Sequence, residues 1–228
     1  MKMDKNSKSL EYYDEKYVSE QNNVAIDNIP TYNKVFQPHA TKEMTILDFG
    51  CGAGILLSVL NGKYKIGVDV NKNALEKAKK NGINEVHTNL DNIKPKSIDL
   101  IVSNSALEHV PNPHQVLSRL YELLKPEGKI LFRVPHETLG WDYKSGDWNY
   151  HLFTWSPMAI GNLFNDVGFS DIEVRIEKGI RPPLFRILRK INLEKIIGYL
   201  YRIFRIILDE LRILRIGVDG YSIVSAKK

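Results

Sequence analysis

The sequence has 228 residues, of which 43% are hydrophobic and 26% are charged, and it contains one cysteine. This length suits one domain with a complete core, and the composition is that of a globular protein rather than a disordered or fibrous one. One cysteine excludes an internal disulfide, and no uncharged apolar run reaches the roughly 18 residues typical of a membrane-spanning helix. Because the N-terminus also has no apolar stretch of signal-peptide length, we expect a cytoplasmic protein.

The net charge of +5 is concentrated in one segment. Residues 181–215 carry nine basic and three acidic side chains, whereas the rest of the chain carries 23 basic and 24 acidic ones. A nucleic-acid-binding protein needs a basic surface, and most of this chain is close to neutral. We therefore do not expect nucleic acid as a partner.

The first predicted elements are two short helices, over residues 10–18 and 30–36. The first carries three tyrosines, whose rings either pack the helix on the domain or close over a ligand, and both alternatives stay open. We assign residues 1–40 to this N-terminal cap and residues 41–228 to the main domain.

The core begins with a strand, a glycine-rich turn and a helix. Residues 45–49 are an apolar run, Gly50, Gly52 and Gly54 follow at alternate positions, and a helix starts at Ile55. Such glycines adopt positive φ and leave no Cβ between the backbone and a ligand. The turn does not match a P-loop, because no Lys-Ser/Thr pair follows the last glycine. A nicotinamide enzyme is disfavoured too, since Ile55 stands where a dinucleotide fingerprint has its third glycine.

Two carboxylates beside this turn favour a different ligand. Asp48 immediately precedes the glycines, where its charge would repel a pyrophosphate but suits an ammonium group. Asp69 ends the next predicted strand, residues 64–69, about 20 residues beyond the turn, where an acid accepts hydrogen bonds from both hydroxyls of a ribose. The pair predicts a ligand with a nucleoside and an amino-acid part, such as S-adenosyl-L-methionine.

These residues resemble the first two motifs of the class I S-adenosylmethionine-dependent methyltransferases. Residues 46–54 (Ile-Leu-Asp-Phe-Gly-Cys-Gly-Ala-Gly) are similar to motif I, and residues 67–71 (Gly-Val-Asp-Val-Asn) to the second motif. The similarity runs from about Tyr12 to Phe169 and resumes near Tyr221. It implies an enzyme that uses S-adenosyl-L-methionine to methylate a small-molecule acceptor. It also implies a Rossmann-like, doubly wound α/β fold, whose seven-stranded and mainly parallel sheet has an antiparallel seventh strand.

The remaining chain fits that fold, because strands and helices alternate as in a parallel sheet covered on both faces. Asn71 and Ser156 are predicted to cap helices, and Gly168 to end one. The further helices are predicted at residues 73–80, 113–124 and 157–167, and the further strands at residues 85–88, 98–103, 129–134, 172–176 and 221–225.

The resemblance also assigns a cofactor site at the ends of the first four strands. It implies cofactor contacts from Tyr13, Asp48, Gly50, Cys51, Gly52, Gly54, Asp69, Val70, Asn89, Leu90, Asp91, Ser103 and Asn104. Among these, Asp91 is the candidate for the adenine amino group, with a turn-forming role as the alternative. Tyr13 is the candidate for closing the site. Cys51 is expected to be a small residue in a tight turn rather than a nucleophile, since no base stands beside it in the sequence.

Methyl transfer is an in-line displacement, so positioning supplies much of the rate. A general base is needed only where the acceptor atom carries a proton, as a hydroxyl does. The catalytic candidates are His109, after the fourth strand, and His151, in a long loop over residues 135–154, and each either contacts the acceptor or supports the loop. His136 also follows a strand. We expect no metal site, because His and carboxylate side chains do not pair at ligand spacing along the sequence.

The sixth and seventh strands form a direct hairpin in the family, but here a basic segment, residues 180–217, separates them. Its apolar residues follow helical spacing, which predicts an amphipathic helical insertion. This insertion packs on its own domain or in a homodimer, or it lies on an anionic membrane surface and makes the protein peripheral at the membrane. A catalytically silent, cofactor-binding partner subunit that acts through the insertion is the alternative to an enzyme. The methylated atom, and whether the acceptor is sugar- or lipid-linked, stays open.

Overall fold

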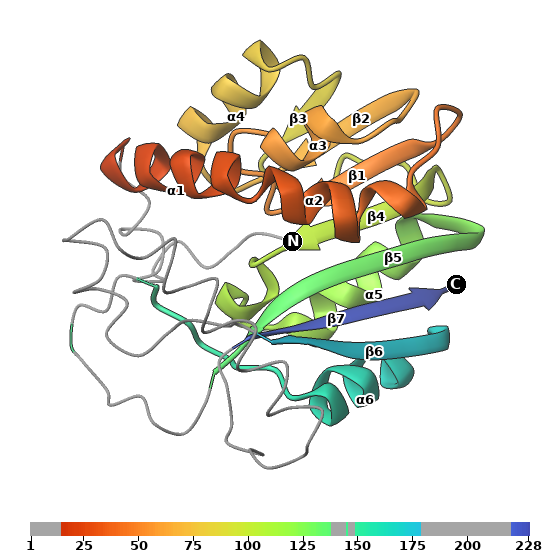
Figure 1. Ribbon diagram of the computed structural model, residues 1–228. Coiled ribbons are helices and arrows are strands. Elements are labelled where there is room, and N and C mark those ends of the chain that lie inside the picture. The colour runs from red at the N-terminus through yellow and green to blue at the C-terminus, as the bar shows by residue number, and fades with distance from the viewer. Residues whose placement is uncertain (1–14, 138–144, 146–148, 179–219) are drawn as a thin grey trace.

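The structure is a computed structural model that describes residues 15–137, 145, 149–178 and 220–228, with the side chains of residues 15–20 excepted. Its centre is a seven-stranded sheet with the strand order β3-β2-β1-β4-β5-β7-β6 (Figure 1). β7 is antiparallel to β5 and β6, and the other neighbouring pairs are parallel, which confirms the predicted Rossmann-like fold. The strands are β1 (Thr45–Phe49), β2 (Tyr64–Val68), β3 (Glu85–His87), β4 (Ile98–Asn104), β5 (Leu124–His136), β6 (Ser170–Lys178) and β7 (Gly220–Lys227).

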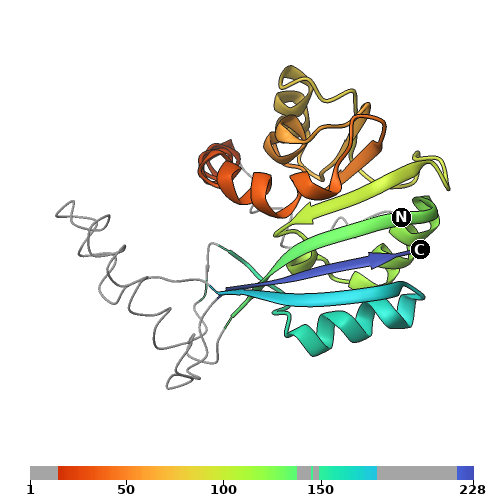
Figure 2. The same cartoon turned by 45° about the vertical axis from the view of Figure 1, so that its right-hand side comes forward.

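Helices cover both faces of this sheet (Figure 2). One buried cluster packs α2, α3 and α4 against the sheet, and a second packs α5 and α6 against it. Neighbouring strand residues such as Ile46 and Leu47 belong to different clusters, which is why the central strands are largely apolar on both faces. The helices are α1 (Glu15–Asp27), α2 (Ile29–Val35), α3 (Ile55–Val59), α4 (Lys72–Lys80), α5 (Pro113–Leu123) and α6 (Pro157–Val167).

Local signals set the helix ends that the sequence predicts. The Asn71 side chain accepts from the amides of Asn73 and Ala74 at 2.9 and 3.1 Å, so it caps α4. Ser156 caps α6 in the same way, and Gly168 ends that helix with a φ of +105°. These caps are confirmed.

The first helix extends further than the sequence predicts. In the described part of the chain, which leaves out residues 10–14, α1 covers Glu15–Asp27 and so continues well beyond the predicted end at Val18. The apolar periodicity fades after Val18, but no glycine or proline interrupts the chain before Pro30. The polar residues therefore continue the helix until α2 begins.

β5 is the second correction. It begins at Leu124 rather than at Lys129, because Leu124 pairs with Ile98 across an irregularity in the β4–β5 register. Within this stretch Glu127 has a φ of +61°, and the β4–β5 register shifts between Ile98 and Leu100. His136 also lies in β5, paired with Gly220, and not in the predicted loop. The bounds of the other predicted core strands and helices differ from those observed by at most two residues.

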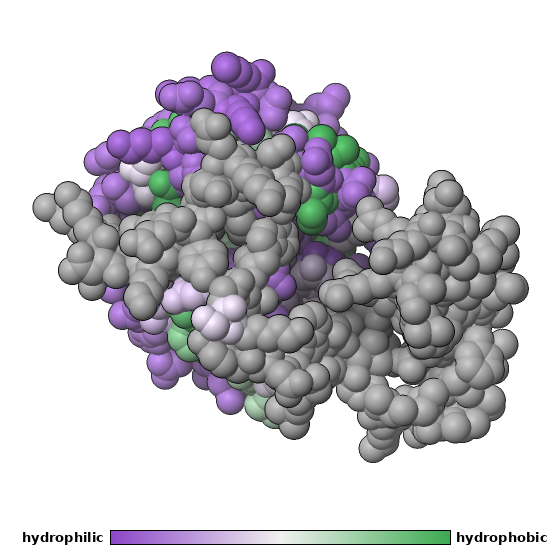
Figure 3. Space-filling view, turned by 90° about the vertical axis from the view of Figure 1, so that its left-hand side faces the viewer, coloured by the Kyte–Doolittle hydropathy of each residue, from purple (hydrophilic) through white to green (hydrophobic). Residues whose placement is uncertain are grey.

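The predicted insertion at residues 180–217 lies outside the described residues, as do Tyr13 and much of the predicted loop. Its two ends are described, because Glu177 and Lys178 in β6 pair with Tyr221 and Gly220 in β7. Lys178 and Gly220, which flank the undescribed segment, are therefore paired neighbours in the sheet, beside the carboxyl end of β5. The described surface on the α1 side of the molecule is mostly hydrophilic (Figure 3). None of the helices in the described ranges has the length and hydropathy required to cross a bilayer.

Candidate active site

A cavity of about 560 Å³ opens at the carboxyl ends of β1, β2, β3 and β4. Its walls come from the segments that follow these strands, from α1 and α2, and from Tyr221 at the start of β7. Open α/β sheets bind their ligands at this edge, and the volume suits a small molecule. The cavity is therefore the candidate active site.

The glycine turn, residues 50–54, forms the floor between β1 and α3. Gly50 has a φ of +76°, and a Cβ there would lie 2.3 Å from the Cβ of Ala106, so packing excludes any side chain. Gly52 has a φ of +51° and lines the cavity, and a Cβ there would meet no atom within 4 Å. The space beside Gly52 is thus open to a ligand, whose close approach to the backbone a side chain would block. Gly54 precedes α3, where its missing Cβ makes room for Ile83 and Ala78.

Asp69 joins the end of β2 to this turn. Its Oδ2 accepts from the amide of Gly52 at 2.8 Å, and its Oδ1 accepts from the amide of Asn71 at 2.9 Å. Burial raises the pKa of Asp69, and the two amides act against that rise. Each carboxylate oxygen has a further lone pair, so the group remains able to accept from ligand hydroxyls.

Asp48 is the most unusual group in the cavity wall. It is 2% exposed, and its Oδ1 has no hydrogen-bond partner among the residues that the structure describes. Burial raises its pKa well above the ordinary value, and the charge of Asp69 raises it further. An unpaired buried carboxyl is costly, so a cationic ligand group beside it would be strongly stabilised.

The other predicted cofactor residues divide into two groups. Cys51, Val70, Asn89, Leu90 and Asn104 line the cavity. Of the described predicted residues, Gly54, Asp91 and Ser103 are outside this lining.

The structure gives these outlying residues other contacts. The Ser103 hydroxyl donates to the carbonyl of Phe49 at 2.7 Å and so ties β4 to β1. The amide of Asp91 donates to the Asn89 side chain at 2.9 Å. Asn89 lines the cavity, and Asp91 lies outside the lining. Burial raises the pKa of the Cys51 thiol, which agrees with a small structural residue and not a thiolate nucleophile.

Sequence reasoning missed a buried arginine that fixes one wall. Arg133 of β5 donates from Nη1 to Oδ1 of Asn104 at 3.0 Å, and from Nε to Glu177 of β6 at 2.6 Å. Its guanidinium also lies 3.2 Å from the ring centroid of Tyr221. Asn104 and Tyr221 both line the cavity, so Arg133 orients two wall residues at once. The available signal in the sequence was Arg133 itself, a charged residue within the largely apolar strand predicted at residues 129–134.

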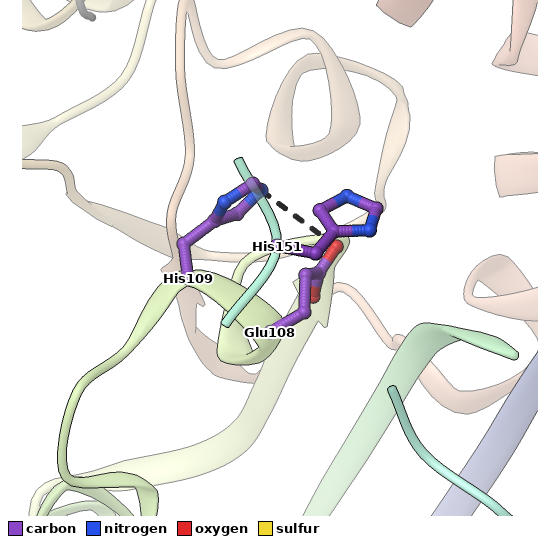
Figure 4. Close-up of side chains that lie close together, drawn as sticks. All are labelled: Glu108, His109 and His151. Atoms are coloured by element: carbon purple, nitrogen blue, oxygen red, sulfur yellow. Dashed lines mark ion pairs between the residues drawn. The ribbon is translucent and has the colours of Figure 1, made fainter. Parts of the chain in front are cut away.

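A second group of side chains, the histidine cluster of Glu108, His109 and His151, lies at the end of β4 (Figure 4). The amides of Leu152 and Phe153 donate to the carbonyl of Glu108 at 2.9 and 3.1 Å and so hold the loop beside β4. The rings of His109 and His151 meet edge to face with centroids 5.0 Å apart. His109 lines the cavity, whereas Glu108 and His151 lie behind it in the described structure.

Each member of the histidine cluster has an unusual environment. Nδ1 of His109 lies 3.4 Å from the carbonyl oxygen of Tyr150, and Nδ1 of His151 lies 2.5 Å from Oε1 of Glu137. Burial and the neighbouring His151 lower the pKa of His109 to about 4, so its ring is neutral near pH 7. Burial raises the pKa of Glu108 to about 8.

One ligand atom from each member lies within 4.8 Å of the others. The spacing along the sequence, from which we expect no metal site, therefore does not reveal how close these three side chains lie in the fold. The third conspicuous histidine, His136, instead pairs through Nδ1 with the carbonyl of Trp155 at 3.2 Å.

Comparison with known proteins decides the family. The model of a methyltransferase domain matches residues 18–174, which is more than half of the chain. The chain belongs to this methyltransferase domain family. Its sheet topology is that of the class I S-adenosylmethionine-dependent methyltransferases.

Curated relatives of this methyltransferase share only part of its length. A ubiquinone biosynthesis O-methyltransferase from Saccharophagus degradans is 36% identical over 102 residues, which cover 40% of this chain and 43% of the relative. One from Vibrio atlanticus is 34% identical over 112 residues, covering 44% of this chain and 45% of the relative. The chain thus spans less than half the length of the curated relatives it matches.

Solved structures share the fold at lower identity. A methyltransferase from Thermotoga maritima has a TM-score of 0.67 and 18% identity over 96% of this chain and 99% of its own. A phosphoethanolamine N-methyltransferase from Haemonchus contortus, solved with S-adenosylhomocysteine, has a TM-score of 0.62 and 20% identity over 88% of this chain and 53% of its own.

The residues present in this methyltransferase fit S-adenosylmethionine. The open face of Gly52 admits a ligand, and the unpaired Asp48 carboxyl suits its ammonium group. Asp69, fixed by two amides, has lone pairs for ribose hydroxyls.

Proposed function

We propose that this protein transfers a methyl group from S-adenosylmethionine to an oxygen atom of a small molecule. The observation that carries the cofactor part is the buried, unpartnered carboxyl of Asp48 beside the open face of Gly52. A neutral or anionic ligand would leave that carboxyl uncompensated, whereas an amino-acid ammonium pairs with it.

Three groups of residues hold the cofactor in this proposal. Asp48 binds the ammonium group, Asp69 accepts from the ribose, and Asn89 with Leu90 flanks the adenine. When bound, S-adenosylmethionine supplies a methyl group on a positively charged sulfur. The chain's own contribution is to hold the acceptor in line with that group and to exclude water, and such positioning supplies much of the rate.

The acceptor binds where the cavity is lined by Asn104, His109 and Tyr221. Arg133 fixes two of these side chains, so this wall is preorganised. An oxygen acceptor is favoured because the curated relatives are named as O-methyltransferases, although they match less than half of this chain. A hydroxyl acceptor must lose a proton, and the neutral His109 ring offers a hydrogen-bonding group on this wall.

The experiment is to incubate the protein and a small-molecule cell extract with methyl-labelled S-adenosylmethionine. We expect label in a small molecule with wild-type protein and none with Asp69→Ala. Tight binding of the cofactor with no transfer of label to any extract fraction would contradict the proposed methyltransferase activity.

A further inference from the structure

We propose that the histidine cluster binds a divalent transition-metal ion of the zinc type. Glu108, His109 and His151 supply one carboxylate oxygen and two imidazole nitrogens, a set that such ions prefer. Mg²⁺ and Ca²⁺ favour all-oxygen sites, so the site is selective against them.

The spacing of the ligand atoms is close to that of a bound site. One ligand atom from each residue lies within 4.8 Å of the others, and Nε2 of His109 lies 3.9 Å from Oε1 of Glu108. Ligands about 2.0–2.2 Å from a tetrahedral ion lie roughly 3.4 Å apart. Side-chain movements of about an ångström close that difference, and each ligand is a side chain with rotatable bonds.

The Glu108 carboxyl group lies where a bound cation would complete its contacts. It is fully buried, and neither of its oxygens has a hydrogen-bond partner among the described residues. Both available neighbours in the cluster are imidazoles rather than lysine or arginine. A buried carboxylate is stable when it is paired or coordinates a metal, and a divalent ion between Glu108 and the two rings satisfies it.

The two rings are also held as metal ligands are held. Oε1 of Glu137 binds Nδ1 of His151 at 2.5 Å, and the Tyr150 carbonyl lies 3.4 Å from Nδ1 of His109. Metal-binding histidines usually pair their second nitrogen with a carboxylate or a backbone carbonyl, which fixes the ring. For His109 this leaves Nε2 toward Glu108.

The position of the site gives the ion a role that rests on the proposed function. His109 lines the cavity on the acceptor wall, so an ion bound to its Nε2 would replace the free ring as the group that contacts an acceptor hydroxyl. A zinc-type ion lowers the pKa of an oxygen bound to it and thereby favours loss of its proton.

The direct test is calorimetric titration of the chelator-treated, full-length protein with ZnCl₂, and separately with MgCl₂. We expect one equivalent of Zn²⁺ to bind and Mg²⁺ to bind far more weakly. Glu108→Gln, which keeps the side chain's shape, and His151→Ala should each weaken Zn²⁺ binding by at least about 100-fold, and Glu137→Gln by about 10- to 100-fold.

His114→Ala is the matched control, because His114 pairs with Asp166 at 3.1 Å on the surface and is 49% exposed. It should leave Zn²⁺ affinity unchanged. Co²⁺ titration of the wild type gives a second readout, in which visible absorption bands report a low-coordinate nitrogen–oxygen site. No Zn²⁺ binding to the wild type, or equal binding by wild type and Glu108→Gln, would overturn the site.

Titration of the metal-free protein with S-adenosylmethionine separates this inference from the proposed function. Cofactor binding without Zn²⁺ binding overturns the metal site alone. Zn²⁺ binding without cofactor binding overturns the proposed function and supports the metal site.

Discussion

The glycine turn and the histidine cluster line or adjoin the same cavity, but they are built in different ways. The turn and its two acids come from one continuous strand–turn–helix–strand unit, and Asp69 is tied to Gly52 by a 2.8 Å hydrogen bond. The histidine cluster forms only where a loop from beyond β5 is held against the end of β4. The first region is thus fixed by local geometry and the second by tertiary contacts. We expect substitutions in the first to affect cofactor binding and in the second to leave it intact.

The largest expected effect is that of Gly52→Val on cofactor affinity. A valine at φ +51° would be strained, and its side chain would enter the open space beside the turn. We expect S-adenosylmethionine affinity, measured by calorimetry, to fall by at least about 100-fold, or about 2.8 kcal/mol.

Gly82→Val is the matched control for strain. Gly82 also has a positive φ, of +84°, and a Cβ there would meet no atom within 4 Å, but this glycine follows α4 and lies away from the cavity lining. Both variants should lose stability by about 1–3 kcal/mol. Equal loss of affinity in the two would show that strain, and not a blocked turn, is responsible.

Asp48→Asn should have opposite effects on stability and on binding. Removing the buried carboxyl should stabilise the ligand-free protein, yet weaken cofactor binding by about 10- to 100-fold because the ammonium loses its charged partner. Thermal unfolding and calorimetric titration measure the two effects. A variant that binds as tightly as wild type would contradict the role of Asp48.

The pH dependence of this stability difference follows from the raised pKa of Asp48. The folded state holds the proton more tightly than the unfolded state, so the wild type loses stability as pH rises above 3.8 toward the folded pKa. The advantage of Asp48→Asn should therefore vanish below that pH and grow above it. Denaturant unfolding across this pH range measures the difference in stability between wild type and Asp48→Asn. A difference that does not change with pH would contradict a raised pKa of Asp48.

Ser156→Ala should have a smaller effect, and on stability alone. The Ser156 hydroxyl caps α6 by accepting from the amide of Ala159 at 3.1 Å. Its loss should cost about 1 kcal/mol, as for other helix caps. Denaturant unfolding measures the cost, and any change in cofactor affinity would show that α6 is coupled to the glycine turn.

The smallest expected effect is that of His151→Ala on cofactor affinity. His151 does not line the described cavity, so the affinity for S-adenosylmethionine should change by less than about 0.5 kcal/mol. Turnover should fall once an acceptor is available. A large loss of cofactor affinity would show that the two regions are not independent.

The sequence predicts the first region well because its determinants are local. Alternating glycines, a preceding acid and an acid ending the next strand are all set by strand and turn geometry, and the structure places Asp48, Gly52 and Asp69 around one cavity. The same is true of helix caps such as Asn71, whose effect reaches only three residues along the chain.

The second region could not be predicted, because nothing in local spacing brings His151 to Glu108. The contact depends on backbone hydrogen bonds from Leu152 and Phe153 across the sheet edge. Tyr221 reaches the cavity for a similar reason, since β7 inserts between β5 and β6. Asp91 lies two residues beyond the lining Asn89 and outside the described cavity lining, which favours its turn-forming alternative over the adenine contact.

The most direct test of the cofactor site is calorimetric titration with S-adenosylmethionine of wild type, Asp69→Ala and the control Asp91→Ala. We predict one bound equivalent for wild type, at least about 100-fold weaker binding for Asp69→Ala, and a change within about 0.5 kcal/mol for Asp91→Ala. Unchanged affinity in Asp69→Ala, or no binding by the wild type, would contradict the assignment of this cavity.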